Sequence, residues 1–161
     1  MNSVADVPRI VTFRVGDDLF AAPIDRVERV LRYEAPRRVP GTAPWVEGVI
    51  DYGGRVVPLV DLRRRFGMPA AARGAPTRVI VLSAPDDWLA IVVDAVLDVR
   101  SLEPAGVDPP PVVLRGAAFD AMHGIVRRGE DLVIVLNIDR LFVSVAEREG
   151  LAAADERITA R

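Results

Sequence analysis

The stretch Trp45–Val60, which reads Trp-Val-Glu-Gly-Val-Ile-Asp-Tyr-Gly-Gly-Arg-Val-Val-Pro-Leu-Val, decides the fold. Two apolar, valine-rich runs at 45–50 and 56–60 flank the segment Asp51–Arg55, which contains two consecutive glycines. Glycine adopts backbone conformations that other residues avoid, so a glycine pair between two such runs favours a tight turn. The sequence therefore predicts a β-hairpin here.

Short valine-rich runs continue along most of the chain. The 161 residues include 26 Val, and Gly, Pro and Asp separate the runs that contain them. β-branched residues favour strands, and this punctuation is typical of an all-β fold of about nine or ten strands in small barrels or a sandwich. Besides the hairpin, strands are expected at 9–15, 19–24, 78–82, 88–94, 95–100, 121–127 and 132–136, and residues 26–33 favour a turn followed by a strand.

The segments between the strands carry their own signals. Proline cannot join the interior of a ladder, so Pro36, Pro40 and Pro44 predict an ordered loop and residues 104–111 an extended one, while Pro23 suggests an edge strand or a bulge. Asp61–Phe66 offers an Asp N-cap and a helical turn closed by Gly67, and 137–142 resembles a second capped turn. Residues 70–76 predict a mobile linker between two halves, and the tail from Val143 is expected to be helical or frayed and dispensable to the core.

The composition excludes most catalytic chemistry. The chain contains no Cys, no Lys and one His, so disulfides, thiolate zinc sites, cysteine nucleophiles and lysine Schiff bases are impossible. All 21 basic residues are Arg and the net charge is -2, which argues against a general nucleic-acid binder. Met1–Val7 lacks a signal-peptide pattern, and no run approaches the roughly 20 apolar residues of a membrane span, so a cytoplasmic protein is expected.

The residues that could carry acid–base chemistry each have a structural interpretation. The Asp86–Asp87 pair falls in a predicted turn, Asp94 and Asp98 flank a strand boundary, and Asp139 falls near a helix start. His123 lacks a partner for a metal site; as a general base it would need Ser83 or Ser101, and neither is in a nucleophile-elbow context. We therefore predict no catalytic residues, no metal and no cofactor.

Three arginine clusters and two aromatic residues stand out. The clusters are Arg37–Arg38, Arg63–Arg65 and Arg127–Arg128, and a solvated surface or pairing with nearby acids is favoured over phosphate binding, since no aromatic residues are interleaved. Trp, Tyr and Arg dominate the energetics of protein interfaces, so Trp45 and Tyr52 are candidate contact residues, with core packing the alternative for Trp45.

From Trp45 to Gly67 the sequence resembles the signature of the CheW-like domain, roughly G-V-I-N-L-R-G-x-V-I-P-V-I-D-L-R-x-R-F-G. Three further segments agree in order and spacing. Residues 13–24 resemble the opening hairpin of the family, Leu89–Val96 its G-L-L-V-D-x-V strand, and Gly124–Phe142 its closing hairpin and L-I-x-L-L-D-I-D-K-L-L run.

The resemblance implies a single CheW-like domain over 9–143, built from two five-stranded SH3-like β-barrel subdomains that share a hydrophobic core, with a linker near 70–76 and a tail over 144–161. It also implies a non-enzymatic adaptor that joins the regulatory domain of a CheA-type histidine kinase to the cytoplasmic tips of chemoreceptors. Carried over by position, the receptor groove would be lined by Val27, Val30, Val96 and Val99. The kinase-binding region would comprise Pro40, Thr42, Pro44, Trp45, Gly48, Tyr52, Arg55 and Val56.

Two positions depart from the family pattern. The frequent N-L-R-G turn reads Asp51–Gly54 here, so Gly53 replaces the Arg, and Arg29 replaces the acid of the V-x-E-I segment. The ion pair that these positions often form cannot exist in this chain, although Arg55 and Glu28 could restore it one residue away. Two alternatives follow: a divergent relative that binds only one of the two partners, and, from the arginine clusters alone, a small β-barrel nucleic-acid binder.

Overall fold

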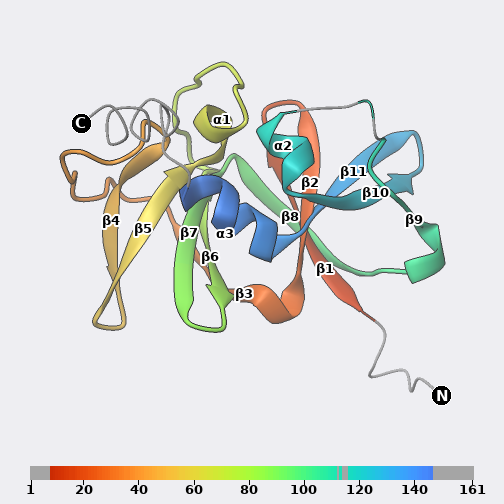
Figure 1. Cartoon of the computed structure of the whole chain (residues 1–161), viewed down its shortest axis with the longest axis horizontal. Helices are drawn as coiled ribbons and strands as arrows, with labels where there is room; N and C mark the ends of the chain where they lie inside the picture. Colours follow the sequence, from red (N-terminus) through yellow and green to blue (C-terminus); the bar gives the residue numbers. More distant parts are fainter. Residues whose placement is uncertain (1–7, 112, 114–115, 147–161) are drawn as a thin grey trace, which may run out of the picture.

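The computed structural model describes residues 8–111, 113 and 116–146, and within these ranges the chain forms two β-sheets (Figure 1). The six-stranded sheet has the spatial order β8 (Ala95–Ser101), β1 (Arg9–Val15), β2 (Asp18–Pro23), β11 (Asp131–Leu136), β10 (Met122–Arg128) and β9 (Val107–Asp108). The five-stranded sheet has the order β3 (Val27–Arg32), β6 (Arg78–Ala84), β7 (Asp87–Val93), β5 (Arg55–Asp61) and β4 (Val46–Tyr52). The helical elements are two 3-10 turns, η2 (Ile24–Arg26) and η3 (Pro104–Gly106), and three helices, α1 (Leu62–Arg65), α2 (Ala117–Asp120) and α3 (Ile138–Ala146).

The predicted hairpin is β4–β5. Tyr52 pairs with Arg55 across the turn, and Gly53 and Gly54 have positive φ angles of 57° and 82°, which only glycine adopts without strain. The Asp51 side chain accepts a hydrogen bond of 3.0 Å from the Gly54 amide and fixes the turn. The other predicted strands also form, and residues 26–33 resolve into the end of η2 followed by β3.

In each sheet a further contact joins strands that are not neighbours in the sheet order. In the five-stranded sheet, Arg37, beyond β3, exchanges two backbone hydrogen bonds of 3.0 and 2.8 Å with Val49 of β4. In the six-stranded sheet, the Arg128 guanidinium of β10 binds the Asp98 carboxylate of β8 at 2.7 Å. Backbone pairing thus joins the two edges of the five-stranded sheet, whereas in the six-stranded sheet an ion pair links the edge strand β8 to β10, the neighbour of the other edge strand β9.

The largest group of buried side chains lies between the two barrels. Phe13 and Phe20 of the six-stranded sheet, Ile80 and Ile91 of the five-stranded sheet and Leu141 of α3 all belong to it. Neighbouring residues of a strand face opposite sides, so the continuous run Val79–Leu82 fills both this shared core and the interior of its own barrel. The predicted fold class, two SH3-like barrels with a common core, is confirmed. The prediction of five strands in each barrel is corrected for one of them, because the two-residue strand β9 makes its sheet six-stranded.

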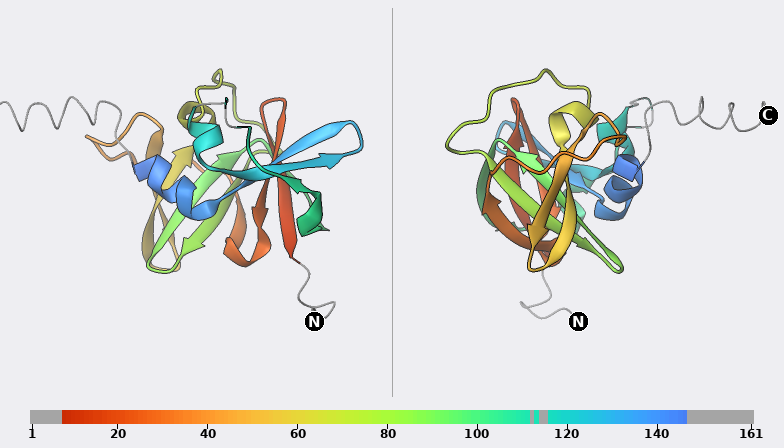
Figure 2. Two further views of the ribbon diagram at one scale, coloured as in Figure 1. Left: turned by 45° about the vertical axis from the view of Figure 1, so that its right-hand side comes forward. Right: turned by 90° about the vertical axis from the view of Figure 1, so that its left-hand side faces the viewer.

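The chain passes directly between the sheets at two short crossings. After β2 the three residues of η2 lead to β3, and after β7 the single residue Asp94 leads to β8. Strands from both halves of the sequence therefore build each sheet, as the mixed colours of the two barrels show in Figure 2.

Asp94 anchors the second crossing. Its carboxylate accepts hydrogen bonds of 2.6 Å from the Gly16 amide, in the β1–β2 turn, and of 2.6 Å from the Arg63 guanidinium of α1. Burial alone raises the pKa of Asp94, but these hydrogen bonds and the charges of Arg63 and Arg14 outweigh burial and hold the pKa below its ordinary value of 3.8. The carboxylate thus ties both sheets and α1 together in its ionised form.

Four expectations about the connections are corrected. Pro23 ends β2, which lies between β1 and β11 and is neither an edge strand nor bulged against them. The loop predicted at 104–111 contains η3 and β9, because only Pro109–Pro111 are barred from the ladder. Residues 70–76 are not free, because Arg73 forms ion pairs with Glu47 and Asp61 and lies over the Tyr33 ring.

The fourth correction concerns the C-terminal tail. Helix α3 continues to Ala146, well beyond the short turn predicted at 137–142. Ser144 and Val145 are buried, and Val145 packs in the shared core while its carbonyl oxygen accepts a 2.9 Å hydrogen bond from the Trp45 indole. The tail is therefore not dispensable up to residue 146, and residues 147–161 lie outside the described part of the chain.

Gly48 is predicted to be indispensable for packing the loop before the hairpin. A Cβ atom at this position would collide with the carbonyl oxygen of Arg37, whose backbone pairs with Val49. We expect Gly48→Ala to lower the free energy of unfolding by about 1–3 kcal/mol, because the backbone must move to relieve the overlap. Chemical denaturation measures the loss. Gly74→Ala is the matched control, since a Cβ there meets its nearest neighbour at an ordinary 3.5 Å, and equal losses in both variants would contradict the prediction.

The lowered pKa of Asp94 predicts how stability depends on pH. A carboxyl group with a depressed folded-state pKa stabilises the fold fully above its unfolded pKa, and this contribution is lost as the pH falls through the folded value. We expect Asp94→Asn to cost about 1–3 kcal/mol at pH 7, because Arg63 and Gly16 lose a charged acceptor. In urea unfolding, the gap between wild type and variant should narrow below about pH 4. Asp86→Asn, in an exposed turn, serves as the control, and a gap that persists unchanged into the acid transition would rule the prediction out.

Candidate functional site

Val27 and Val30 project from the same side of β3 because the strand contains a β-bulge. They lie three positions apart, which in a regular strand would place them on opposite faces. The register shifts between Val27, opposite Leu82, and Arg29, opposite Val81, so that Val30 pairs with Ile80. Leu82 and Ile80 both face the shared core, and Val27 and Val30 therefore face it too.

Val96 and Val99 are brought together by the same device on β8. The register shifts between the pairs Thr12–Asp98 and Phe13–Val96, which leaves Leu97 as the additional residue. Val99 pairs with Val11 and Val96 with Phe13, and alternate residues of β1 point to one face. Both valines of β8 therefore project on the side of Phe13, which belongs to the shared core.

Each pair of valines thus projects toward the side of the shared core, and we call these four residues the valine margin. Val27 and Val96 are partly buried and pack against the same core, whereas Val30 and Val99 are 39% and 43% exposed. β3 and β8 are both edge strands of their sheets. Within the described residues no further strand pairs with their outer sides, so a partner could approach there. The geometry suits an apolar helix face better than a small polar ligand.

A second candidate surface lies at the turn end of the β4–β5 hairpin. The Tyr52 and Trp88 rings lie 5.2 Å apart, and the Arg55 guanidinium lies 4.3 Å from the centre of the Trp88 ring. Val56, the next residue of β5, is 73% exposed. Tyr52, Arg55 and Trp88 thus form an aromatic and cationic surface at the end of the five-stranded barrel, while Val56 projects from the opposite face of β5. These four residues are here called the hairpin tip.

The predicted kinase-binding residues do not form one surface. Pro40, Thr42 and Pro44 precede β4, whereas Tyr52 ends it and Arg55 and Val56 begin β5. A seven-residue strand spans about 20 Å. Trp45 is only 7% exposed, with Arg65 stacked on its ring, and Gly48 is buried against Arg37. The core-packing alternative for Trp45 is therefore the one that the structure supports. A role of Trp45 and Gly48 in kinase binding stays a prediction.

Trp88 was missed by sequence reasoning. Trp88 is the second residue of β7 and follows the Asp86–Asp87 turn directly. In the sequence it cannot be distinguished from an ordinary strand residue. Its neighbours Tyr52 and Arg55 come from a hairpin more than thirty positions earlier in the sequence. An aromatic residue next to a tight turn was the only local signal.

The two departures from the family pattern are not compensated by a new ion pair. Arg29 forms no ion pair or side-chain hydrogen bond within the described residues, and Gly53 occupies the positive-φ turn. Arg55 stacks on Trp88, and Glu28 belongs to β3, which is separated from β5 by β6 and β7 in the sheet order. The alternative pair of Arg55 with Glu28 is therefore not formed.

The acidic residues considered for catalysis have structural partners. Asp98 binds Thr12, Arg100 and Arg128, and the hydrogen bond from Thr12, followed by those arginines, lowers its pKa despite burial. The hydrogen bond and the charge of Arg26 lower the pKa of Asp139. Asp87 accepts from the Trp88 amide, while Asp86 lies exposed in the same turn.

His123 and the two serines are not assembled into a nucleophilic site. The Ser83 hydroxyl donates to the Arg26 carbonyl oxygen, and Ser101 lies exposed at the end of β8. In the described ranges no three His, Asp or Glu side chains are placed to hold a metal ion. Nor is any helix in that part of the chain long and apolar enough to cross a membrane.

The Arg63–Arg65 cluster is built into the fold. Arg63 binds Asp94 and the Pro69 carbonyl oxygen, Arg64 binds the Pro44 carbonyl oxygen at 3.0 Å, and Arg65 binds the Ser144 carbonyl oxygen at 2.8 Å. These contacts join α1 to the loop before β4 and to α3. They leave little of this cluster for a nucleic-acid phosphate.

Comparison with known proteins identifies the fold and the family. Residues 9–146 match the family model described as the CheW-like domain. The chain is 29% identical over 140 residues to the chemotaxis protein CheW of Treponema pallidum (strain Nichols), covering 84% of this chain and 82% of that protein. It is 32% identical over 139 residues to the protein FrzA of Myxococcus xanthus, covering 84% and 86%.

A solved structure supports the same assignment. The crystal structure of the scaffolding protein TtCheW from Thermoanaerobacter tengcongensis superposes with a TM-score of 0.75 at 25% identity, over 81% of this chain and 84% of that one. The family match spans both barrels, the valine margin and the hairpin tip. The chain therefore belongs to the CheW-like domain family, whose members are non-catalytic scaffold proteins of chemotaxis.

Proposed function

We propose that this protein is a cytoplasmic adaptor that couples chemoreceptors to a CheA-type histidine kinase. The valine margin carries the proposal, because a β-bulge in each of two edge strands projects a pair of valines toward the side of the shared core. The relatives named CheW and the structural relative described as a scaffolding protein support the same role.

The valine margin is the proposed receptor site. A helical receptor tip would lay its apolar face along Val30 and Val99, while Val27 and Val96 form the floor that rests on the core. This is helix-in-groove recognition, in which buried apolar area supplies most of the affinity at about 25 cal/mol per Å². The same contact leaves the hairpin tip free for a second partner.

The hairpin tip is the proposed centre of the kinase site. Trp, Tyr and Arg side chains dominate interface energetics, and Tyr52, Arg55 and Trp88 hold one another in a fixed arrangement before any partner arrives. Val56 adds an exposed aliphatic side chain at the same end of the hairpin, on the opposite face of β5. Pro40, Thr42 and Pro44 would contribute a separate contact at the other end of β4.

A negative charge introduced at the valine margin is predicted to weaken receptor binding without weakening kinase binding. Val30→Glu and Val99→Glu each place a carboxylate on an exposed position, so the fold should tolerate them. We expect at least a tenfold loss of affinity for a receptor signalling fragment, because a charge would have to be buried without a partner. Affinity for the kinase regulatory domain should change less than twofold in titration calorimetry.

Val56→Glu is the reciprocal control. It introduces the same charge at the hairpin tip and should weaken kinase binding while leaving receptor binding unchanged. If all three variants weakened both interactions equally, the two surfaces would not be separate sites. If the wild-type chain bound neither partner at micromolar concentrations, the proposed function itself would be wrong.

The missing ion pair distinguishes the proposal from a relative that binds one partner only. Because Arg55 and Trp88 already provide a preformed contact, we expect the double variant Gly53→Arg, Arg29→Glu to change kinase activation in receptor-containing assemblies by less than twofold. Gly53→Ala is the control for backbone strain, since any side chain at this φ costs about 1–2 kcal/mol. A wild-type chain without kinase activation that the double variant restores would instead favour the single-partner alternative.

A further inference from the structure

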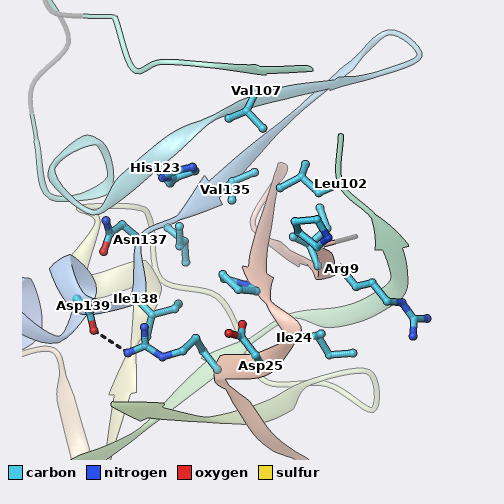
Figure 3. Close-up of a pocket in the computed structure, with 15 residues that line it drawn as sticks. Arg9, Ile24, Asp25, Leu102, Val107, His123, Val135, Asn137, Ile138 and Asp139 are labelled. Atoms are coloured by element: carbon cyan, nitrogen blue, oxygen red, sulfur yellow. Dashed lines mark hydrogen bonds and ion pairs between the residues drawn. The ribbon is translucent and has the colours of Figure 1, made fainter. Parts of the chain in front are cut away.

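A cavity of about 730 Å³ opens on the six-stranded barrel at the end where β1 begins and β11 passes into α3 (Figure 3). Its walls come from the start of β1, η2, the segment around Leu102 and Val107, and residues 135–139. It contains none of the residues of the valine margin or the hairpin tip. A cavity of this size lies within the range of ordinary binding pockets.

The walls of the cavity are mainly aliphatic. Ile10 and Val135 are buried and form its floor, and Ile24 is 38% exposed at its mouth. Leu102 and Val107 face the cavity from the opposite side (Figure 3). An occupant with a flexible hydrocarbon portion would therefore replace water along most of its length.

Four charged groups line the cavity: Arg26 and Asp139 form an ion pair, and Arg9 and Asp25 have no ionic partner among the described residues. Arg26 donates to the Ser83 carbonyl oxygen and to the Asp139 carboxylate, both at 2.7 Å. The guanidinium of Arg9 extends away from the cavity in Figure 3. Asp25 has no ion pair or side-chain hydrogen bond with any described residue, and Figure 3 shows its carboxylate directed inwards.

We propose that this cavity receives a basic side chain, lysine in the first instance, from an aliphatic segment of a partner protein. A lysine combines a long aliphatic stem with a cationic head, which matches aliphatic walls and one unpaired carboxylate. An acidic occupant would meet the charges of Asp25 and Asp139, and a purely apolar one would leave Asp25 unpaired while covering it. This chain contains no Lys, so the lysine must belong to another molecule.

The single histidine gives a direct reporter for this site. His123 lines the cavity and is the only His of the chain, so its imidazole resonance in NMR spectra is unambiguous. The probes are three capped tripeptides, N-acetyl-Leu-Lys-Leu-amide and its counterparts with norleucine or glutamate in the centre. At constant pH, we expect the lysine peptide to shift the His123 resonance with a dissociation constant at least roughly fivefold lower than that of the norleucine peptide, and the glutamate peptide to bind most weakly.

Two carboxylate variants complete the test. Asp25→Asn should remove the preference for lysine over norleucine, whereas Asp17→Asn, an exposed position in the β1–β2 turn, should keep it. The preference should also decrease at high salt, because the carboxylate is accessible to solvent. Equal affinities for lysine and norleucine in the wild type, an unchanged preference in Asp25→Asn, or no shift of His123 would each overturn the proposal. Binding of receptor and kinase fragments is measured on other surfaces, so these outcomes are independent of the proposed function.

Discussion

The abrupt crossing at Asp94 is the constraint on which the arrangement of the two barrels depends. One residue separates the end of β7 in one sheet from the start of β8 in the other, so the sheets must meet where that residue lies. The carboxylate of Asp94 fixes the junction through the Gly16 amide and Arg63. The η2 crossing performs the same task between β2 and β3, and Arg26 ties it to the Ser83 carbonyl oxygen. The shared core fills the space that these two crossings define.

The valine margin follows from the same constraint. β3 and β8 are the strands that begin immediately after the two crossings, and Val27 and Val96 lie at their first and second positions. Each strand has a β-bulge directly after this valine. The bulge places the next valine of the strand, Val30 or Val99, on the same face. A β-bulge leaves one residue of the strand unpaired in the hydrogen-bonded ladder. Both bulges here occur on edge strands, whose outer sides have no partner strand in any case. The binding surface is thus a product of connection geometry and strand irregularity.

Sequence patterns predicted the elements whose cause is local. The glycine pair at 53–54 determines a turn wherever it lies between two apolar runs, and Asp61 caps α1 through the Arg63 amide as its spacing suggested. The sequence left core packing and surface contact open for Trp45, because its partner Val145 lies 100 residues away. The bulges were hidden for a similar reason, since register depends on the opposing strand. Trp88 and the cavity beside Asp25 likewise arise only when distant segments meet.

The interleaving of the sheets also determines how this chain could be divided. A cut between α1 and β6 would leave β1 and β2 on the first piece, while β8 to β11 of the same barrel remained on the second. Neither piece would contain a complete barrel or its own half of the shared core. The two pieces would regain an ordered structure only by associating with each other, as in a split reporter. A cut at the middle of the chain therefore cannot separate the two barrels, although their outline resembles two modules joined by a connection.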